Sequence, residues 1–194
     1  GNIIDYGVKN SFDLRKELGK ILKKEKTFKK RECAFFDYRC FKRALNQAKT
    51  ILYLGDNTGE VVFDRILIEE IKRIFKNKDI IYAVKERPII NDALVEDAYE
   101  CGINKIAKII SCGAGAPGTI LSQCSKKFLK IYRKAEMIIS KGQGNFEVLS
   151  EEKRPIFFLF MAKCPVVAND VRCKVGDIIL LYGLRKDRLH EKIS

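Results

Sequence analysis

Histidine and paired cysteines are scarce in this chain of 194 residues, and their scarcity excludes several classes of protein. The one histidine is His190, and the seven cysteines form no Cys-x-x-Cys pair, so the spacing of a structural zinc site is absent. No run of 18 apolar residues occurs, which excludes a membrane-spanning helix. The first residues show neither the basic nor the apolar region of a secretory signal. We therefore expect a cytoplasmic protein that does not contact membranes and whose cysteines are reduced and mostly buried.

The composition is that of a globular protein, with 46% hydrophobic and 32% charged residues. A chain of this length buries about 70% of its extended surface on folding, so it needs no disulfide or metal to hold its core together. The length corresponds to about one domain.

Positive charge is in excess, with 38 Lys and Arg against 25 Asp and Glu and a net charge of +13. The excess is concentrated in residues 1–50, which carry 14 basic and 6 acidic residues. A basic surface can bind a nucleic acid. No aromatic-interleaved RNA motif and no helix-turn-helix pattern accompanies it, so we favour a solvated helical surface over a nucleic-acid partner.

Apolar runs alternate with amphipathic segments along most of the chain. Helices are expected over 11–30 and 37–49, and the buried runs predict strands at 50–54, 79–84, 108–112, 137–140, 156–162 and 178–182. Residues 166–168 are a candidate for a further strand. Such alternation predicts an α/β fold, a doubly wound and largely parallel sheet flanked by helices, with an N-terminal helical segment. We divide the chain into that segment, 1–49, an appendage or the remnant of a larger helical region, and an α/β domain, 50–194.

Three helices are expected between these strands. The helix after the first strand should bury one apolar face, made of Val62, Ile66, Leu67, Ile71 and Ile74. A second should span 92–101, with Asn91 as its N-cap and Gly102 at its end, and a third should span 120–134.

Polar residues follow the first two strands of the α/β domain. Asp56 and Asn57 come after the first strand and Asp92 after the second, at the sheet edge where ligands of such folds bind. Carboxylate and amide oxygens are the donors that a divalent ion such as Mg, Mn, Co or Ni accepts. Glu60 and Asn91 are candidates to support these ligands from behind. Alternatively, the side chains of Asp56, Asn57 and Asp92 cap helices.

The later strands end in residues suited to binding phosphate. Gly118 and Thr119 lie in the glycine-rich turn 113–119, Lys141 and Asn145 follow the fourth strand, and Lys163 follows the fifth. Backbone amides in such a turn bind phosphate, and lysines neutralise its charge. The alternative is that the glycines only form tight turns, at Gly142 with a positive φ angle, and that Lys163 is a surface lysine.

Taken together, these segments resemble the DUF89 family, the metal-dependent damage-control phosphatases also called ARMT1-like, and most closely its prokaryotic branch. The resemblance covers residues 30–182 and is carried by DNTGEVVFD at 56–64, KERPIIND at 85–92, PGT at 117–119, SKGQGNFE at 140–147 and AKC at 162–164. It implies a divalent metal held by Asp56, Asn57 and Asp92. It also makes Lys163 the counterpart of the lysine in the family's Arg-Thr-x-Lys motif, although the arginine and threonine are replaced here.

The sequence therefore predicts a metal-dependent phosphohydrolase acting on small phosphorylated metabolites, as the resemblance implies, such as sugar phosphates or damaged phosphometabolites. Asp56 and Asp92 are the expected catalytic residues, and a metal-bound water and an aspartyl-phosphate both remain open as mechanisms. Two alternatives stand beside it: an S-adenosylmethionine-dependent carboxyl methyltransferase and a non-enzymatic nucleic-acid-binding module. The sequence does not give the oligomeric state.

Overall fold

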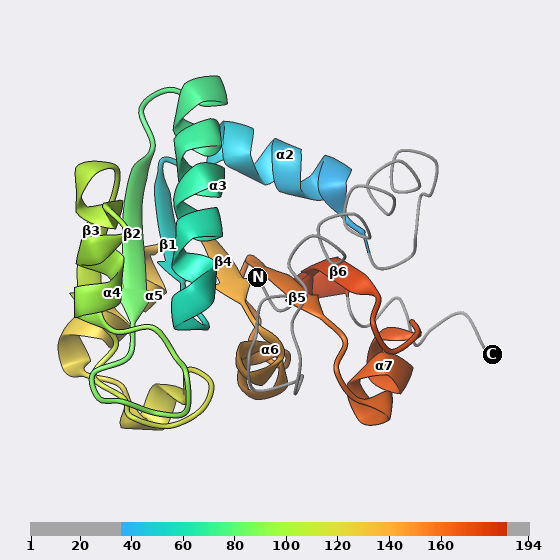
Figure 1. The fold of residues 1–194 in the computed structure, drawn as a ribbon. Helices are drawn as coiled ribbons and strands as arrows, with labels where there is room; N and C mark the ends of the chain where they lie inside the picture. Colours follow the sequence, from blue (N-terminus) through green and yellow to red (C-terminus); the bar gives the residue numbers. More distant parts are fainter. Residues whose placement is uncertain (1–35, 186–194) are drawn as a thin grey trace, which may run out of the picture.

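A six-stranded sheet forms the centre of the computed structural model, which describes residues 36–185 (Figure 1). The strands are β1 (Thr50–Leu54), β2 (Asp79–Val84), β3 (Lys108–Ser111), β4 (Met137–Lys141), β5 (Ile156–Met161) and β6 (Ile178–Tyr182). Their order is β3-β2-β1-β4-β5-β6, and all neighbours are parallel except β6, which is antiparallel to β5. The predicted α/β class and the six strands are confirmed.

Helices cover both faces of this sheet. The α-helices are α2 (Tyr38–Gln47), α3 (Val61–Ile74), α4 (Val95–Glu100), α5 (Lys126–Lys134), α6 (Gln143–Leu149) and α7 (Pro165–Val171). Side chains of α2, α3 and α4 pack with Ile51 and Tyr53 of β1, whereas side chains of α5, α6 and α7 pack with Leu52 and Leu54. Alternate residues of β1 thus serve two separate cores, as expected of a strand buried on both faces.

Of the N-terminal segment, the structure describes α2 and the residues just before it. Asp37 accepts a hydrogen bond from the backbone N–H of Tyr182 at 2.9 Å, and the ring of Phe41 meets that of Phe157 edge to face at 5.3 Å. This helix therefore packs on the sheet itself. The predicted helix 11–30 lies outside the described residues, and the boundary at residue 49 stays a prediction.

The predicted apolar face of α3 is only partly right. Ile71 is buried and Leu67 packs against the core, but Val62, Ile66 and Ile74 are more than half exposed. The inward face also carries three residues that were not predicted, Val61, Asp64 and Ile68. The carboxylate of Asp64 thus lies in the core, where it accepts hydrogen bonds from buried polar side chains that are described below.

Three smaller predictions of secondary structure also need correction. Residues 166–168 belong to α7 and not to a strand, since Pro165 occupies the first turn, where a missing N–H costs nothing. The helix predicted from residue 92 begins at Val95, so Asn91 is not its N-cap, while Gly102 follows it with a φ angle of 74°. The helix predicted from residue 120 begins at Lys126, where Ser125 accepts from the N–H of Phe128.

The cysteines within the described residues are free thiols, but only Cys112 among them is buried, so the expectation of mostly buried cysteines is wrong. Between residues 36 and 185, no helix is long and apolar enough to cross a membrane.

Candidate active site

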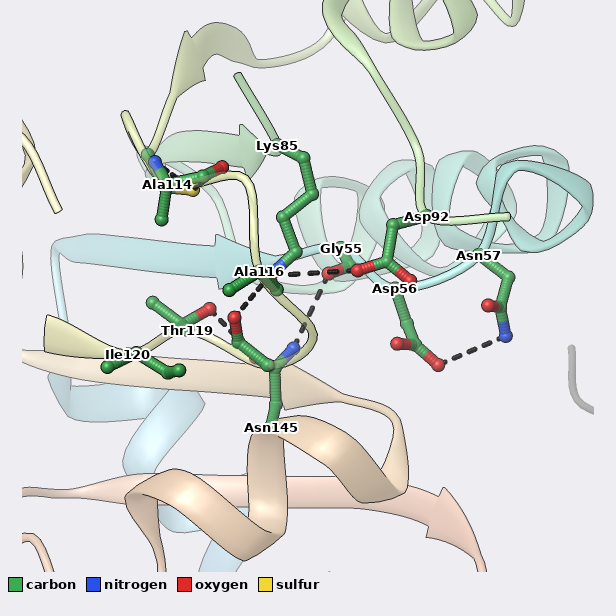
Figure 2. Close-up of polar contacts among 12 residues, drawn as sticks. Gly55, Asp56, Asn57, Lys85, Asp92, Ala114, Ala116, Thr119, Ile120 and Asn145 are labelled. Atoms are coloured by element: carbon green, nitrogen blue, oxygen red, sulfur yellow. Dashed lines mark hydrogen bonds and ion pairs between the residues drawn. The ribbon is translucent and has the colours of Figure 1, made fainter. Parts of the chain in front are cut away.

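The loops that follow β1 and β2 are joined to each other by backbone hydrogen bonds. Asn57 and Asp92 form an isolated antiparallel bridge. The N–H of Ala93 donates to the carbonyl of Asp56 at 2.7 Å, and the N–H of Thr58 donates to that of Asn91 at 2.9 Å. This pairing brings Asp56, Asn57 and Asp92 together at the carboxyl edge of the sheet, and Figure 2 shows the two aspartates converging between the loops.

The helix-capping alternative does not hold for these side chains. Asn57 precedes the short 3₁₀ turn Thr58–Glu60, yet its side chain makes no capping hydrogen bond, and neither does that of Glu60 in front of α3. Asp92 lies two residues before Leu94, the N-cap of α4. The polar groups are therefore directed toward each other rather than toward helix ends.

Asp56 is the electrostatic centre of the cluster. Burial, reinforced by the carboxylates of Glu60 and Asp92, raises the pKa of Asp56 to about 7, although Lys163 and Lys141 oppose this. Burial also raises the pKa of Asp92, against the charges of Lys85 and Lys163. Negative charge is thus concentrated here and incompletely compensated.

Glu60 orients the amide of Asn57. The Nδ2 of Asn57 donates to the Oδ2 of Asp56 at 3.1 Å and to the Oε1 of Glu60 at 3.2 Å (Figure 2 shows the first of these). Both hydrogen bonds use the Nδ2 and so fix the orientation of the planar amide. Glu60 is 3% exposed, and its place behind metal ligands stays a prediction.

Lys141 lies in a buried network behind the cluster. Its Nζ donates to the Oε2 of Glu60 at 3.0 Å and to the Oδ1 of Asp64 at 2.7 Å. The same Asp64 accepts from the hydroxyls of Tyr53 at 2.7 Å and Tyr82 at 2.8 Å. Burial lowers the pKa of Lys141, but the two carboxylates outweigh it and the pKa is raised. The ammonium predicted to contact phosphate is thus engaged by two carboxylates in this structure.

Thr119 and Asn145, two more of the predicted phosphate contacts, hold each other. The hydroxyl of Thr119 donates to the Oδ1 of Asn145 at 2.7 Å (Figure 2). The Nδ2 of Asn145 donates to the carbonyl of Lys141 at 2.7 Å. Both residues are buried. Their side chains attach the glycine-rich turn to the start of α6.

Two glycines are required by close approaches at this edge. Gly142 has a φ angle of 85°, as the turn interpretation predicts, and a Cβ placed there would clash with the carboxylate of Asp56. Gly118 has a φ angle of 71°, and a Cβ there would lie 2.6 Å from the carbonyl of Gly144. The absence of these side chains lets the loop after β4 approach Asp56 at Gly142 and lets the loop after β3 approach α6 at Gly118.

Lys163 is the exposed lysine of the predicted set. Its backbone N–H donates to the Oε1 of Gln143 at 2.8 Å, which fixes the loop after β5 against α6. Its charge lowers the pKa of both Asp56 and Asp92, so its ammonium lies on the side of the two carboxylates.

Sequence reasoning missed two functional candidates, Lys85 and Asp64. Lys85 is 4% exposed and donates to the carbonyls of Ala116 and Gly118. A lysine directly after a buried strand was the available signal for it. For Asp64 the signal was a carboxylate in helical register with Val61 and Ile68.

The donor set agrees in its chemistry with a hard divalent ion. Asp56, Asn57 and Asp92 offer oxygen ligands. A cation would offset the burial and the two neighbouring carboxylates that raise the pKa of Asp56. Within residues 36–185 no three His, Cys, Asp or Glu side chains gather into a metal cluster. The predicted set has only two charged donors and depends on the amide for its third.

A six-stranded α/β sheet with a carboxylate cluster at the topological switch between β1 and β4 defines a class of ligand-binding proteins. The model of the damage-control phosphatase ARMT1-like domain matches residues 1–179, so the chain belongs to this family. A damage-control phosphatase of Pyrococcus horikoshii is 43% identical over 183 residues, and one of Archaeoglobus fulgidus is 36% identical over 181.

Similarity to a solved structure extends to the fold. The crystal structure of a DUF89 family protein from Pyrococcus horikoshii superimposes with a TM-score of 0.79 at 39% identity, covering 94% of this chain and 62% of that one. The archaeal phosphatases are matched over 93% and 92% of this chain but over 61% and 60% of their own length. The chain thus spans about three fifths of the length of these two relatives.

Proposed function

We propose that this chain is a phosphohydrolase that depends on a divalent metal and acts on small phosphorylated metabolites. The observation that carries the proposal is the meeting of Asp56, Asn57 and Asp92 through the paired loops after β1 and β2. The names of the archaeal relatives support a phosphatase acting in damage control. Sugar phosphates and damaged phosphometabolites are the substrates that we propose.

Asp56, Asn57 and Asp92 would hold the ion. When bound, the ion supplies positive charge to a phosphoryl oxygen. Lys163, exposed beside the carboxylates, neutralises a further phosphoryl oxygen, and the backbone of the turn at Gly118 and Thr119 binds the phosphate by its N–H groups.

Lys141 and Asn145 belong to the proposed phosphate site because each holds another part of the site in place. Lys141 fixes Glu60, which in turn orients the amide of Asn57. Asn145 fixes the glycine-rich turn through Thr119. Loss of either would displace groups that contact the phosphate or the ion.

Asp56 and Asp92 are the two carboxylates placed to act as base or nucleophile. Either role requires the deprotonated form. Nearby positive charge favours that form at Asp56, where burial and two neighbouring carboxylates disfavour it.

A screen of phosphorylated metabolites with Mg, Mn, Co and Ni tests the proposal. We expect release of inorganic phosphate that requires an added ion and stops with a chelator. Transfer of a methyl group from S-adenosylmethionine without added metal, or nucleic-acid binding that weakens steeply with salt in the absence of phosphate release, would contradict it.

A further inference from the structure

Lys85 connects two parts of the site that come from different strands. Its side chain extends from the end of β2, is 5% exposed, and ends between the glycine-rich turn and Asp92 (Figure 2). The Nζ donates to the carbonyl of Ala116 at 2.8 Å and to that of Gly118, and it lies 3.6 Å from the Oδ2 of Asp92. A buried ammonium is stable only with such partners.

These contacts determine which way the turn faces. A planar trans peptide directs its N–H opposite to its carbonyl. The carbonyl of Gly118 points at Lys85, so the N–H of Thr119 points away from it. Lys85 therefore satisfies the carbonyls of Ala116 and Gly118 and leaves the N–H of Thr119 for a ligand.

We propose that Lys85 is a positioning residue that holds the glycine-rich turn, residues 113–119, at a fixed distance from Asp92. A phosphate can then contact the turn and an ion at Asp92 at the same time. This inference rests on the proposed phosphohydrolase function and assigns Lys85 no contact with substrate.

If Lys85 acted only as a positive charge, its variants would behave differently from those of a positioning residue. Two variants of Lys85 distinguish these roles. Lys85→Met removes the ammonium but keeps an unbranched chain. Lys85→Arg keeps the charge, but a planar guanidinium does not reproduce the three contacts of a compact ammonium in a buried space. Lys78→Met is the matched control, because Lys78 also donates to two backbone carbonyls, those of Asn46 and Ala48, but lies before β2 at the opposite edge of the sheet.

The test uses the full chain with Mn²⁺ and inorganic phosphate as probes. It compares amide hydrogen exchange in residues 113–119 without ligands, inhibition by inorganic phosphate, and the kcat and KM for a phosphate ester. We expect Lys85→Met and Lys85→Arg to accelerate exchange in the turn and to weaken phosphate inhibition by about 10- to 100-fold. Lys78→Met should lower thermal stability without either change.

Each outcome bears on the proposal. Unchanged exchange and unchanged phosphate inhibition in Lys85→Met would overturn it, and full rescue by Lys85→Arg would replace positioning by charge. If Lys85→Met does not fold, Lys85→Arg decides alone by the same two measurements. If the wild type neither binds Mn²⁺ nor releases phosphate, the proposed function fails, while exchange in the turn still tests whether Lys85 holds it.

Discussion

Asp56 shows how the sequence around one carboxylate determines its chemistry. The side chain is held between the Nδ2 of Asn57 and the backbone of Gly142, close to Glu60 and Asp92. These neighbours determine the space around the Asp56 carboxylate and its pKa. Three predictions concern single residues of this site.

Gly142→Ala should abolish phosphate release. The new Cβ clashes with the carboxylate of Asp56, and the φ angle of 85° adds a strain of about 1–3 kcal/mol. Gly176→Ala is the matched control, because Gly176 has a φ angle of 90° with nothing within 4 Å of an added Cβ. Both variants should melt at lower temperature in calorimetry, and only Gly142→Ala should lose turnover. Equal activity of the two variants would show that the close approach of Gly142 to Asp56 does not matter for turnover.

The raised pKa of Asp56 makes the metal-free protein sensitive to pH. Since the folded state keeps the proton up to about pH 7 and the unfolded state loses it near pH 4, stability should fall as pH rises through this window. The upper limit is about 1.4 kcal/mol per pKa unit.

Asp56→Asn removes this effect, so the variant should be more stable than the wild type at pH 8 and equally stable near pH 4. Urea unfolding in a chelating buffer at both pH values measures the difference. If the wild type gained stability relative to the variant between pH 4 and pH 8, the pKa of the Asp56 carboxyl would not be raised.

Lys163→Ala should raise the KM for a phosphate ester, lower kcat, or both, because the exposed ammonium that faces the two aspartates is lost. Lys153→Ala, at an exposed lysine before β5, is the control. Steady-state kinetics identical to the wild type would remove Lys163 from the site.

At the scale of elements, the strands were predictable and the buried face of α3 was not. The run at 50–54 is apolar and partly β-branched, so its burial on both sides follows from composition. Helical periodicity alone placed Val62 and Ile66 inside, whereas α3 turns Asp64 inward toward Tyr53 and Tyr82. The partners of Asp64 come from other strands, and no local pattern contains them.

The same limit applies to the site. The meeting of Asp56, Asn57 and Asp92 was predictable because they lie in the loops that follow neighbouring parallel strands, whose carboxyl ends share one edge. The partners of Lys141 and Lys85 were not, since both depend on contacts between segments more than 25 residues apart in the chain. Whether Lys141 also contacts a phosphate stays a prediction.

Tyr53→Phe tests the role of the network that attaches α3 to the sheet. It removes a buried hydrogen bond to a charged carboxylate, so the free energy of unfolding should fall by about 1.5–3 kcal/mol. Tyr132→Phe is the control, because its hydroxyl makes only a 3.4 Å contact with Glu152 in a half-buried place. Denaturant unfolding of both variants gives the comparison, and a smaller loss for Tyr53→Phe than for Tyr132→Phe would contradict this role for the network.

At the scale of the whole molecule, the fold gathers groups from five of its strands at one edge. The loops after β1 and β2 bring the oxygen donors, the loop after β3 approaches α6 at Gly118, the loop after β4 approaches Asp56 at Gly142, and the loop after β5 brings Lys163. We propose that three side chains from two of these loops bind one ion.

Titration calorimetry of Mn²⁺ into the chelator-treated chain tests this claim most directly. The account predicts one ion per chain and an affinity that falls by at least about tenfold in each of Asp56→Asn, Asn57→Ala and Asp92→Asn, as loss of a partner at a metal site does. Asp79→Asn, at an exposed aspartate at the start of β2, should bind as the wild type does. Equal affinity in all four variants and the wild type would contradict the account.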